Sequence, residues 1–171
     1  MSARNKAALA LGAILIGASP AVAAPVSAPV PPQGRALLLI PLTLTKVQDL
    51  HFGTVVPSSL PGTVTIDATT GLRTGSPQVT LVGSDVGQRG QFAGAGSPGQ
   101  QVIMALTPPA VLGNGFGDTI TVQSMSLDGP NTRTIAADQT FYVGVGGVLQ
   151  IGADQPEGLY TATYDLTADY Q

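Results

Sequence analysis

The sequence contains no cysteine and no tryptophan, only one histidine, and charged residues at 10% of its 171 positions. Without cysteine, the chain has no disulfide, no thiolate metal site and no cysteine nucleophile. The charged fraction is far below the roughly 25% of an ordinary soluble domain. The seven basic residues form no patch that would neutralise a phosphate backbone. The composition therefore argues against a nucleic-acid partner and against most enzyme chemistries.

The amino terminus has the three parts of a secretory signal peptide. Arg4 and Lys6 give a basic start, residues 7–18 are an uncharged and mostly apolar run, and residues 21–23 (AVA) have the form of a cleavage site. The apolar run is shorter than the roughly 20 residues that span a bilayer, and no later run is long enough. We expect residues 1–23 to be removed and the protein to be exported to the periplasm, the cell surface or the medium.

The segment that follows is expected to be an extended leader at residues 24–35. It holds four prolines in residues 24–34, and proline-rich segments are extended rather than packed. Beyond residue 23 the chain keeps five basic residues against ten acidic ones, a net charge of −5. Neither an internal repeat nor a second domain is visible, so we expect one domain at residues 36–171.

The remaining sequence favours strands over helices. Beyond residue 23 it has one lysine and one glutamate, and runs of alternating apolar and polar residues lie between glycines and prolines. The expected strands lie at residues 36–45, 50–56, 63–67, 78–83, 90–94, 101–106, 118–127, 140–145, 148–152 and 158–170. Short strands separated by turns predict an all-β fold, an antiparallel sandwich of two sheets.

Two local irregularities stand out within these runs. Gly146-Gly147 separates two alternating runs and predicts a two-residue hairpin turn. In residues 118–127 the apolar phase slips by one residue, which predicts a β-bulge near Gln123-Ser124.

The carboxyl-terminal run has the clearest alternation. Its even positions are aromatic or aliphatic and its odd positions are threonine or aspartate, which predicts a long strand with one buried face. The even positions are Tyr160, Ala162, Tyr164, Leu166, Ala168 and Tyr170. This strand either belongs to a complete sandwich or forms the wall of a groove that a partner strand fills, and both interpretations stay open.

Two motifs are typical of a nucleotide-binding site and of a catalytic site, but the residues around each of them do not match such a site. The glycines from Gly94 to Gly99 match G-x-G-x-x-G, yet Pro98 removes an amide donor and a strand, not a helix, is expected next, so a tight turn is favoured over a nucleotide site. His51 has Asp49 two residues away, but no G-x-S-x-G elbow accompanies them. We therefore assign no catalytic residue, no cofactor and no metal.

Three motifs carry a family resemblance. They are Leu50-His51-Phe52-Gly53, the F-x-x-x-G-x-x-G pattern of residues 92–99, and Gly158-Leu159-Tyr160. Together they resemble a bacterial secreted family of unknown function, which is similar to subunits of chaperone–usher fimbriae and to spore coat U-type proteins. As in such subunits, a glycine (Gly158) stands fourteenth from the end and an aromatic residue (Tyr170) is penultimate.

The resemblance implies an Ig-like (pilin-like) β-sandwich that lacks one strand. A periplasmic chaperone, and then a neighbouring subunit, would fill the gap by β-strand addition. The implied assembly and chaperone contacts are Gly158, Tyr160, Ala162, Tyr164, Leu166, Ala168 and Tyr170. A donor strand, or else the domain's first strand, is expected from the alternation of Ala36, Leu38, Ile40, Leu42 and Leu44.

Two departures from fimbrial subunits are visible: the chain has no disulfide, and its leader is rich in proline, which cannot donate to a β-ladder. The sequence as a whole predicts an exported, non-enzymatic structural subunit of fimbrial type. The alternative is a self-complete secreted sandwich that binds a surface ligand, either a glycan or a protein.

Overall fold

The computed structural model describes residue 26, residues 29–31 and residues 33–171. The chain divides after Leu37 into two units, and all twelve strands belong to the second, Leu38–Gln171. The described residues of the first unit are exposed and contain no strand. The predicted signal peptide, residues 1–23, lies outside the described residues, as does part of the predicted leader.

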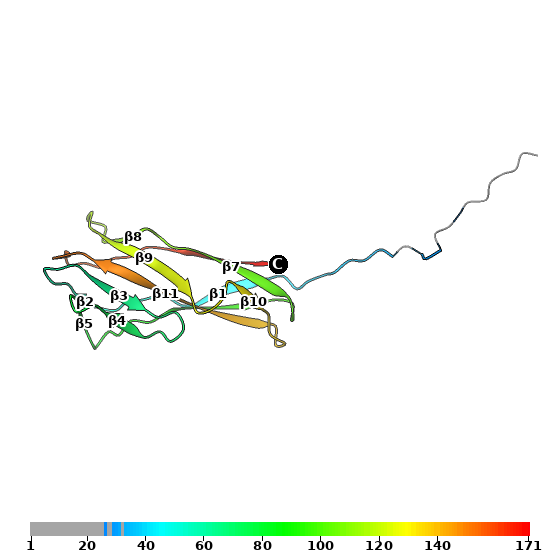
Figure 1. Ribbon diagram of the computed structural model, residues 1–171, viewed down its shortest axis with the longest axis horizontal. Helices are drawn as coiled ribbons and strands as arrows, with labels where there is room; N and C mark the ends of the chain where they lie inside the picture. The colour runs from blue at the N-terminus through cyan, green and yellow to red at the C-terminus, as the bar shows by residue number, and fades with distance from the viewer. Residues whose placement is uncertain (1–25, 27–28, 32) are drawn as a thin grey trace, which may run out of the picture. The chain divides into compact units, whose positions relative to one another are not determined.

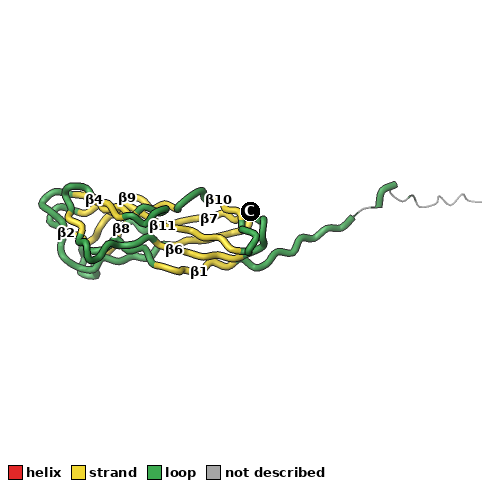
Figure 2. Tube along the Cα trace, turned by 90° about the horizontal axis from the view of Figure 1, so that it is seen from below, coloured by secondary structure: helices red, strands yellow, loops and turns green. Residues whose placement is uncertain are grey.

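The second unit contains a large sheet centred on β11 (Thr140–Ile151). One edge of β11 pairs first with β6 (Gly90–Ala95) and then with β3 (Gly62–Ile66), while β9 (Thr119–Leu127) pairs with the other edge. The sheet is completed by the outer strands β1 (Thr43–Gln48), β4 (Arg73–Gly75) and β8 (Val111–Gly113). Figure 2 shows β1, β6 and β11 side by side in this curled sheet.

Two smaller sheets complete the unit. The three-stranded sheet has the order β10 (Thr132–Thr134), β7 (Gln101–Thr107) and β12 (Asp165–Tyr170). The two-stranded sheet joins β2 (Val55–Val56) to β5 (Thr80–Leu81). Every pairing is antiparallel, and no helix occurs among the described residues, so the all-β antiparallel class is confirmed (Figure 1). The narrower Ig-like topology stays a prediction.

Two apolar clusters hold the sheets together. The first lies between the three-stranded sheet and the half of the large sheet that contains β1 and β6; its buried members are Val102, Met104, Ile135, Phe141 and Val143. The second lies toward the other half of β11; its buried members are Val64, Ile120, Leu149 and Ile151. Burial of each such side chain stabilises the fold by about 1.5–3 kcal/mol.

The prediction of a hairpin turn at Gly146-Gly147 is wrong, because β11 is continuous from Thr140 to Ile151. The two glycines lie where neighbouring chains approach closely. A Cβ atom on Gly146 would collide with the main chain of Ile66 and Ala68, and one on Gly147 would lie 2.9 Å from the carbonyl oxygen of Ser124. Glycine is therefore needed here for close packing of backbone rather than for a turn.

The predicted bulge is confirmed. Val148 pairs with Ser124, whereas the next residue, Leu149, pairs with Val122, so that Gln123 has no partner on β11. This extra residue accounts for the slip in the apolar phase between Val122 and Met125.

The strand predicted at residues 36–45 begins only at Thr43. Its partner β6 ends at Ala95, which pairs with Thr43, so residues before Thr43 have no strand beside them. Leu42 and Leu44 nevertheless pack against the first cluster, as a first strand would require. Ala36, Leu38 and Ile40 lie outside any strand. The prediction was thus wrong for residues 36–42.

The strand predicted at residues 158–170 is regular only from Asp165 to Tyr170. Its partner β7 ends at Thr107, and Pro108-Pro109 follows, which offers no N–H group to a ladder. The predicted alternation is confirmed along β12, where Leu166, Ala168 and Tyr170 are half-buried and the odd positions are exposed.

Other predicted strands changed at their ends. The run at 50–56 is reduced to a bridge at His51 and the short β2, because Gly53 has a φ of +73° and interrupts the extended chain. The run at 78–83 is reduced to β5. The three-residue strands β4, β8 and β10 were not predicted, because they are too short to show a period.

Candidate functional site

A groove of about 780 Å³ opens between two segments of the chain. One wall consists of residues 49–57, which continue from β1, and the other consists of residues 155–164, which lead into β12. The floor is apolar and comes from the second cluster: Leu112, Ile120, Leu149 and Ile151. Three carboxylates but no lysine or arginine belong to the lining, namely Asp49, Asp85 and Glu157.

The strands that adjoin the two walls, β1 and β12, come together outside the groove, where Leu44 and Leu166 both pack against the first cluster. The hydroxyl of Tyr170 donates a hydrogen bond to the carbonyl oxygen of Ile40 and accepts one from the amide of Ser97, both at 2.7 Å. The amide of Ile40 in turn donates to the Ser97 hydroxyl at 2.7 Å. We call the end of the groove next to β1 and β12 the closed end, and the end next to residues 55–57 and 155–160 the open end.

The wall that leads into β12 presents unpaired main-chain groups. Thr161 exchanges two main-chain hydrogen bonds with Gly113, and Gln171 donates to Gln101, so odd-numbered residues pair on the side of β8 and β7. The main-chain groups of even-numbered residues point to the opposite edge. In the second unit, no main-chain hydrogen bond is made by Tyr160 or Ala162. This edge is therefore able to accept another strand.

The opposite wall is fixed by an arginine. The guanidinium of Arg73 donates to the carbonyl oxygens of Phe52 at 3.2 Å, Thr54 at 3.1 Å and Val82 at 2.6 Å. Gly53 lies under this guanidinium with a positive φ, and a Cβ atom there would collide with Arg73 and with the carbonyl oxygen of Asp85. The glycine of the Leu50–Gly53 motif is thus required by conformation and by space, and the contact holds Phe52 against the second cluster.

Asp85 ties the same wall to the loop before β6. Its carboxylate accepts a hydrogen bond from the Thr54 hydroxyl at 2.8 Å and lies 3.5 Å from Nδ1 of His51. The Thr54 hydroxyl, followed by the nearby His51, holds the pKa of Asp85 below its ordinary value of 3.8. Asp49, the neighbour considered for His51 in the sequence, instead pairs with Lys46 at 2.7 Å.

The floor contains a small apolar pit of about 60 Å³. Its lining comes from both walls and from the large sheet: Leu50, Phe52, Pro109, Leu112, Val122, Met125, Leu149, Ala162 and Tyr164. The ring of Tyr164 meets Phe92 edge to face at 6.2 Å. Burial, followed by the charge of Asp49, raises the pKa of the Tyr164 hydroxyl. The pit offers space for an apolar side chain of whatever enters the groove.

The structure divides the predicted contact residues into two groups. Gly158, Tyr160, Ala162 and Tyr164 line the groove. Leu166, Ala168 and Tyr170 pack against the first cluster instead. The opposite wall and Arg73 were not among the predicted site residues. The signal that could have found them is the Leu50–Gly53 motif, whose glycine interrupts an otherwise regular strand pattern.

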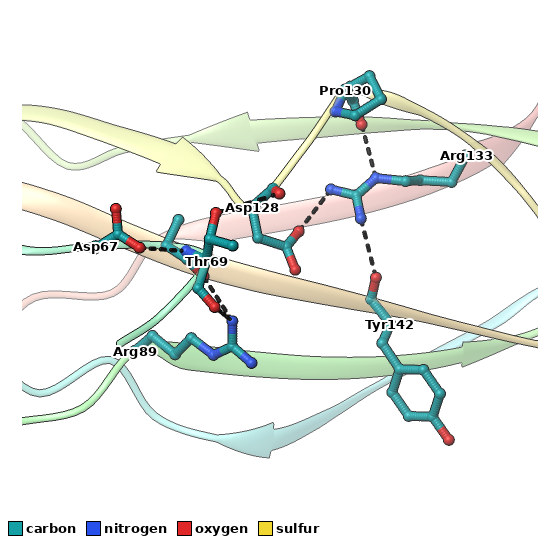
Figure 3. A network of polar contacts seen from close by, with 8 residues as sticks. Asp67, Thr69, Arg89, Asp128, Pro130, Arg133 and Tyr142 are labelled. Carbon is teal, nitrogen blue, oxygen red and sulfur yellow. Dashed lines mark hydrogen bonds and ion pairs between the residues drawn. The ribbon is translucent and has the colours of Figure 1, made fainter. Parts of the chain in front are cut away.

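A second group of polar residues has a structural explanation (Figure 3). Arg133 pairs with Asp128 at 2.7 Å and donates to the carbonyl oxygens of Pro130 and Tyr142. Arg89 likewise donates to the carbonyl oxygens of Ala68 and Thr69. These guanidinium groups satisfy loop and edge carbonyls at the end of β9, and their donors are used within the chain.

The glycine-rich segment 94–99 forms the turn that the sequence predicted. It joins β6 to β7, and the amides of Gly96 and Gly99 donate to the carbonyl oxygens of Gln139 and Ile135. Among residues 26, 29–31 and 33–171, no three histidine or acidic side chains gather as metal ligands would. Within the same residues, no helix is long and apolar enough to cross a membrane.

Comparison with known proteins identifies one family. Its sequence pattern, described as Domain of unknown function (DUF4402), matches residues 42–170 and so spans both walls of the groove and its floor. No curated protein and no solved structure matches the chain. The match makes no link to fimbrial subunits or to spore coat U-type proteins, so that resemblance stays a prediction. The chain belongs to the family described as Domain of unknown function (DUF4402).

Proposed function

We propose that this protein is an exported, non-enzymatic structural subunit that accepts a β-strand from a neighbouring copy in its groove. The observation that carries the proposal is the groove itself, with an apolar floor below and an unpaired strand edge along one wall. An added strand would pair with the main chain of Tyr160 and Ala162 and would cover the floor. In such strand addition the main-chain bonds give affinity and side-chain pockets, here the pit, give specificity.

The proposed occupant is the segment 34–39 of a second copy, which ends just before Ile40, the residue bonded to Ser97 and Tyr170 of its own chain. Its residues Ala36 to Leu39 are all apolar, and Leu37 and Leu38 are 75% and 88% exposed. Exposed apolar side chains in a row are a surface that gains free energy from burial.

Chain length favours a second copy, rather than the same chain, as the source of the strand. Ile40 is bonded to Tyr170, and the wall begins nine residues later at Asp49, roughly 30 Å away along an extended chain. From Ile40 back to Ala36 the chain spans only about 13 Å. A neighbouring copy is therefore the source of the strand in this proposal.

Charge supports the same occupant. The donor segment has one charged residue, Arg35, whereas the groove lining has three carboxylates and no lysine or arginine. A cationic strand entering an acidic groove is favoured by electrostatic complementarity. The edge is also a hazard before assembly, because unpaired strand edges promote aggregation. We therefore include a periplasmic chaperone that covers this edge as a proposed partner, in keeping with the resemblance to fimbrial subunits.

The test is binding of a labelled peptide of residues 33–42 to the full chain. We expect saturable binding and a rise in the thermal unfolding midpoint, because a ligand that binds only the folded state stabilises it. The variant Ala162→Arg, which fills the groove, should weaken binding at least tenfold. The matched variant Thr163→Arg, on an exposed neighbour outside the groove lining, should bind as the wild type does.

Binding that is absent in the wild type, or equal in Ala162→Arg and Thr163→Arg, would contradict strand acceptance. A control peptide with Ala36→Asp and Leu38→Asp shows whether the apolar alternation is what the groove recognises, and we expect it not to bind. Circular dichroism of both protein variants checks that they remain folded.

The second candidate function is ligand binding by a self-complete secreted domain. It is favoured by the groove volume of about 780 Å³, which falls in the usual range of about 300–1,000 Å³ for ligand sites. In that case a glycan or a surface protein, and not the 33–42 peptide, would raise the unfolding midpoint, and Ala162→Arg would abolish that rise.

A further inference from the structure

Two large apolar side chains are exposed at the open end of the groove. Phe116, at the tip of the hairpin between β8 and β9, is 92% exposed, and Leu159, on the wall before β12, is 79% exposed. Phe116 is held by an ordered loop. The Asn114 side-chain oxygen accepts hydrogen bonds from the amides of Phe116 at 2.8 Å and Asp118 at 3.1 Å.

The two residues lie on loops that touch. A Cβ atom on Gly158 would lie 3.3 Å from Cβ of Asn114, and Gly113 and Thr161 exchange main-chain hydrogen bonds. Glycine at position 158 thus allows the wall to pack against the hairpin. We refer to Phe116 and Leu159 as the apolar rim. The hairpin between β8 and β9 lies at the end of the second unit away from the carboxyl terminus (Figure 1).

The folded part of the donating copy, which we call its body, must lie close to its donor segment, because few residues separate the two. The donor segment ends at Leu39, Ile40 is bonded within its own copy, and β1 of the same copy begins at Thr43. The folded body of the donating copy must therefore lie directly where its strand leaves the groove. At the closed end β1 and β12 pack together on the first cluster, so the strand leaves at the open end, beside the rim.

This geometry also sets the direction of assembly. Each copy sends out its donor segment at Ile40, beside Tyr170, and receives a strand at an opening beside Gly158. Gly158 and Tyr170 are twelve positions apart in the sequence. An extended chain of that length separates the two points by roughly 40 Å. Contacts between different ends of identical copies are heterologous and do not close on themselves, so they generate open filaments.

We infer that the apolar rim, Phe116 and Leu159, is the surface on which the folded body of the next copy sits once its strand occupies the groove. This inference rests on the proposed function and adds a contact at the rim of the groove. Leu159 also lines the groove, whereas Phe116 lies outside its lining, so mutation of Phe116 separates the contact with the body from the binding of the strand.

The experiment compares two measurements on the full chain and on the variant Phe116→Ser, which leaves the groove lining unchanged. The first is self-association, followed by sedimentation over a range of protein concentrations. The second is binding of the labelled 33–42 peptide. We expect self-association to weaken by about 10- to 100-fold, the loss for an apolar anchor of this size, and peptide binding to stay within twofold. The matched control Leu72→Ser removes another large apolar side chain, 64% exposed on the turn before β4, and should change neither.

Each other outcome overturns the inference in a distinct way. Unchanged self-association in Phe116→Ser, with peptide still bound, would show that the rim is not an interface while the strand-accepting groove stands. Equal loss of peptide binding and self-association would show that Phe116 belongs to the groove. A wild-type chain that binds no peptide would overturn the proposed function, and the inference with it.

Discussion

Single residues fix the wall of the groove that has no regular strand. Arg73 replaces the missing ladder by donating three hydrogen bonds to main-chain carbonyl oxygens, two of them on the wall itself, at Phe52 and Thr54. Gly53 makes this arrangement possible, because a side chain at that position would occupy the place of the guanidinium. The wall is thus shaped by side-chain bonding from β4, together with the short pairing of β2 with β5 and the bridge between His51 and Gln88.

The residue-scale prediction concerns Gly53→Ala. We expect it to lower the free energy of unfolding by about 2 kcal/mol or more, because a left-handed conformation costs roughly 1–2 kcal/mol with a side chain and the contact with Arg73 must also open. The nearby Gly83→Ala is the control, since no atom lies within 4 Å of its Cβ position, and it should stay within about 0.5 kcal/mol of wild type. Urea denaturation measures both, and equal stabilities would refute the role given to Gly53.

At the scale of elements, the alternation of apolar and polar residues predicts which side chains are buried, but it does not predict where a strand begins or ends. The alternation along β12 and the bulge at Gln123 are visible in the sequence because side-chain burial follows the pleat. Where a strand ends depends on its partner, which local alternation does not report. The ends of β1 and β12 are set by Ala95 and Thr107, the last paired residues of distant strands. For the same reason, the sequence did not predict the wall of residues 49–57 as part of the site, because its alternation is that of a strand but only the short β2 forms there.

The glycine pair in β11 shows a second limit. Gly-Gly favours turns, and nothing in the local sequence reports that Ile66 and Ala68 pass close beside Gly146. Only the tertiary structure supplies that crowding, and it turns a residue typical of hairpins into a requirement of the sheet interior.

The element-scale prediction is that Gly146→Ala destabilises the protein by about 3 kcal/mol. An added methyl group must displace the main chain of β3 and the residues after it, and overpacking of this kind costs roughly 1–3 kcal/mol or more. Gly113→Ala, in strand β8, is the matched control, because its Cβ position lies 4.0 Å from the nearest atom. Thermal unfolding compares the two variants. A tolerated Gly146→Ala would mean that the crowding at this position is easily relieved.

At the scale of the whole molecule, the donor segment and the groove carry charges of opposite sign. The chain carries seven basic and ten acidic residues, and the donor segment contributes one of the basic ones, Arg35. Arg35 belongs to the first unit of the chain, whereas the acids of the groove, Asp49, Asp85 and Glu157, belong to the second. Joining two copies therefore pairs opposite charges, although each copy has a negative net charge.

The last prediction concerns the effect of salt on this pairing. We expect binding of the 33–42 peptide to weaken by a few-fold between about 10 mM and 0.5 M salt, because exposed charge pairs contribute roughly 0–1 kcal/mol and salt screens them. A peptide with Arg35→Gln should bind a few-fold more weakly at low salt and should lose most of the salt dependence, since its attraction to the groove is gone. Fluorescence anisotropy titrations of both peptides measure the effect. If the two peptides show the same salt dependence, Arg35 does not face the acidic groove, and the strand enters in another register or from another source.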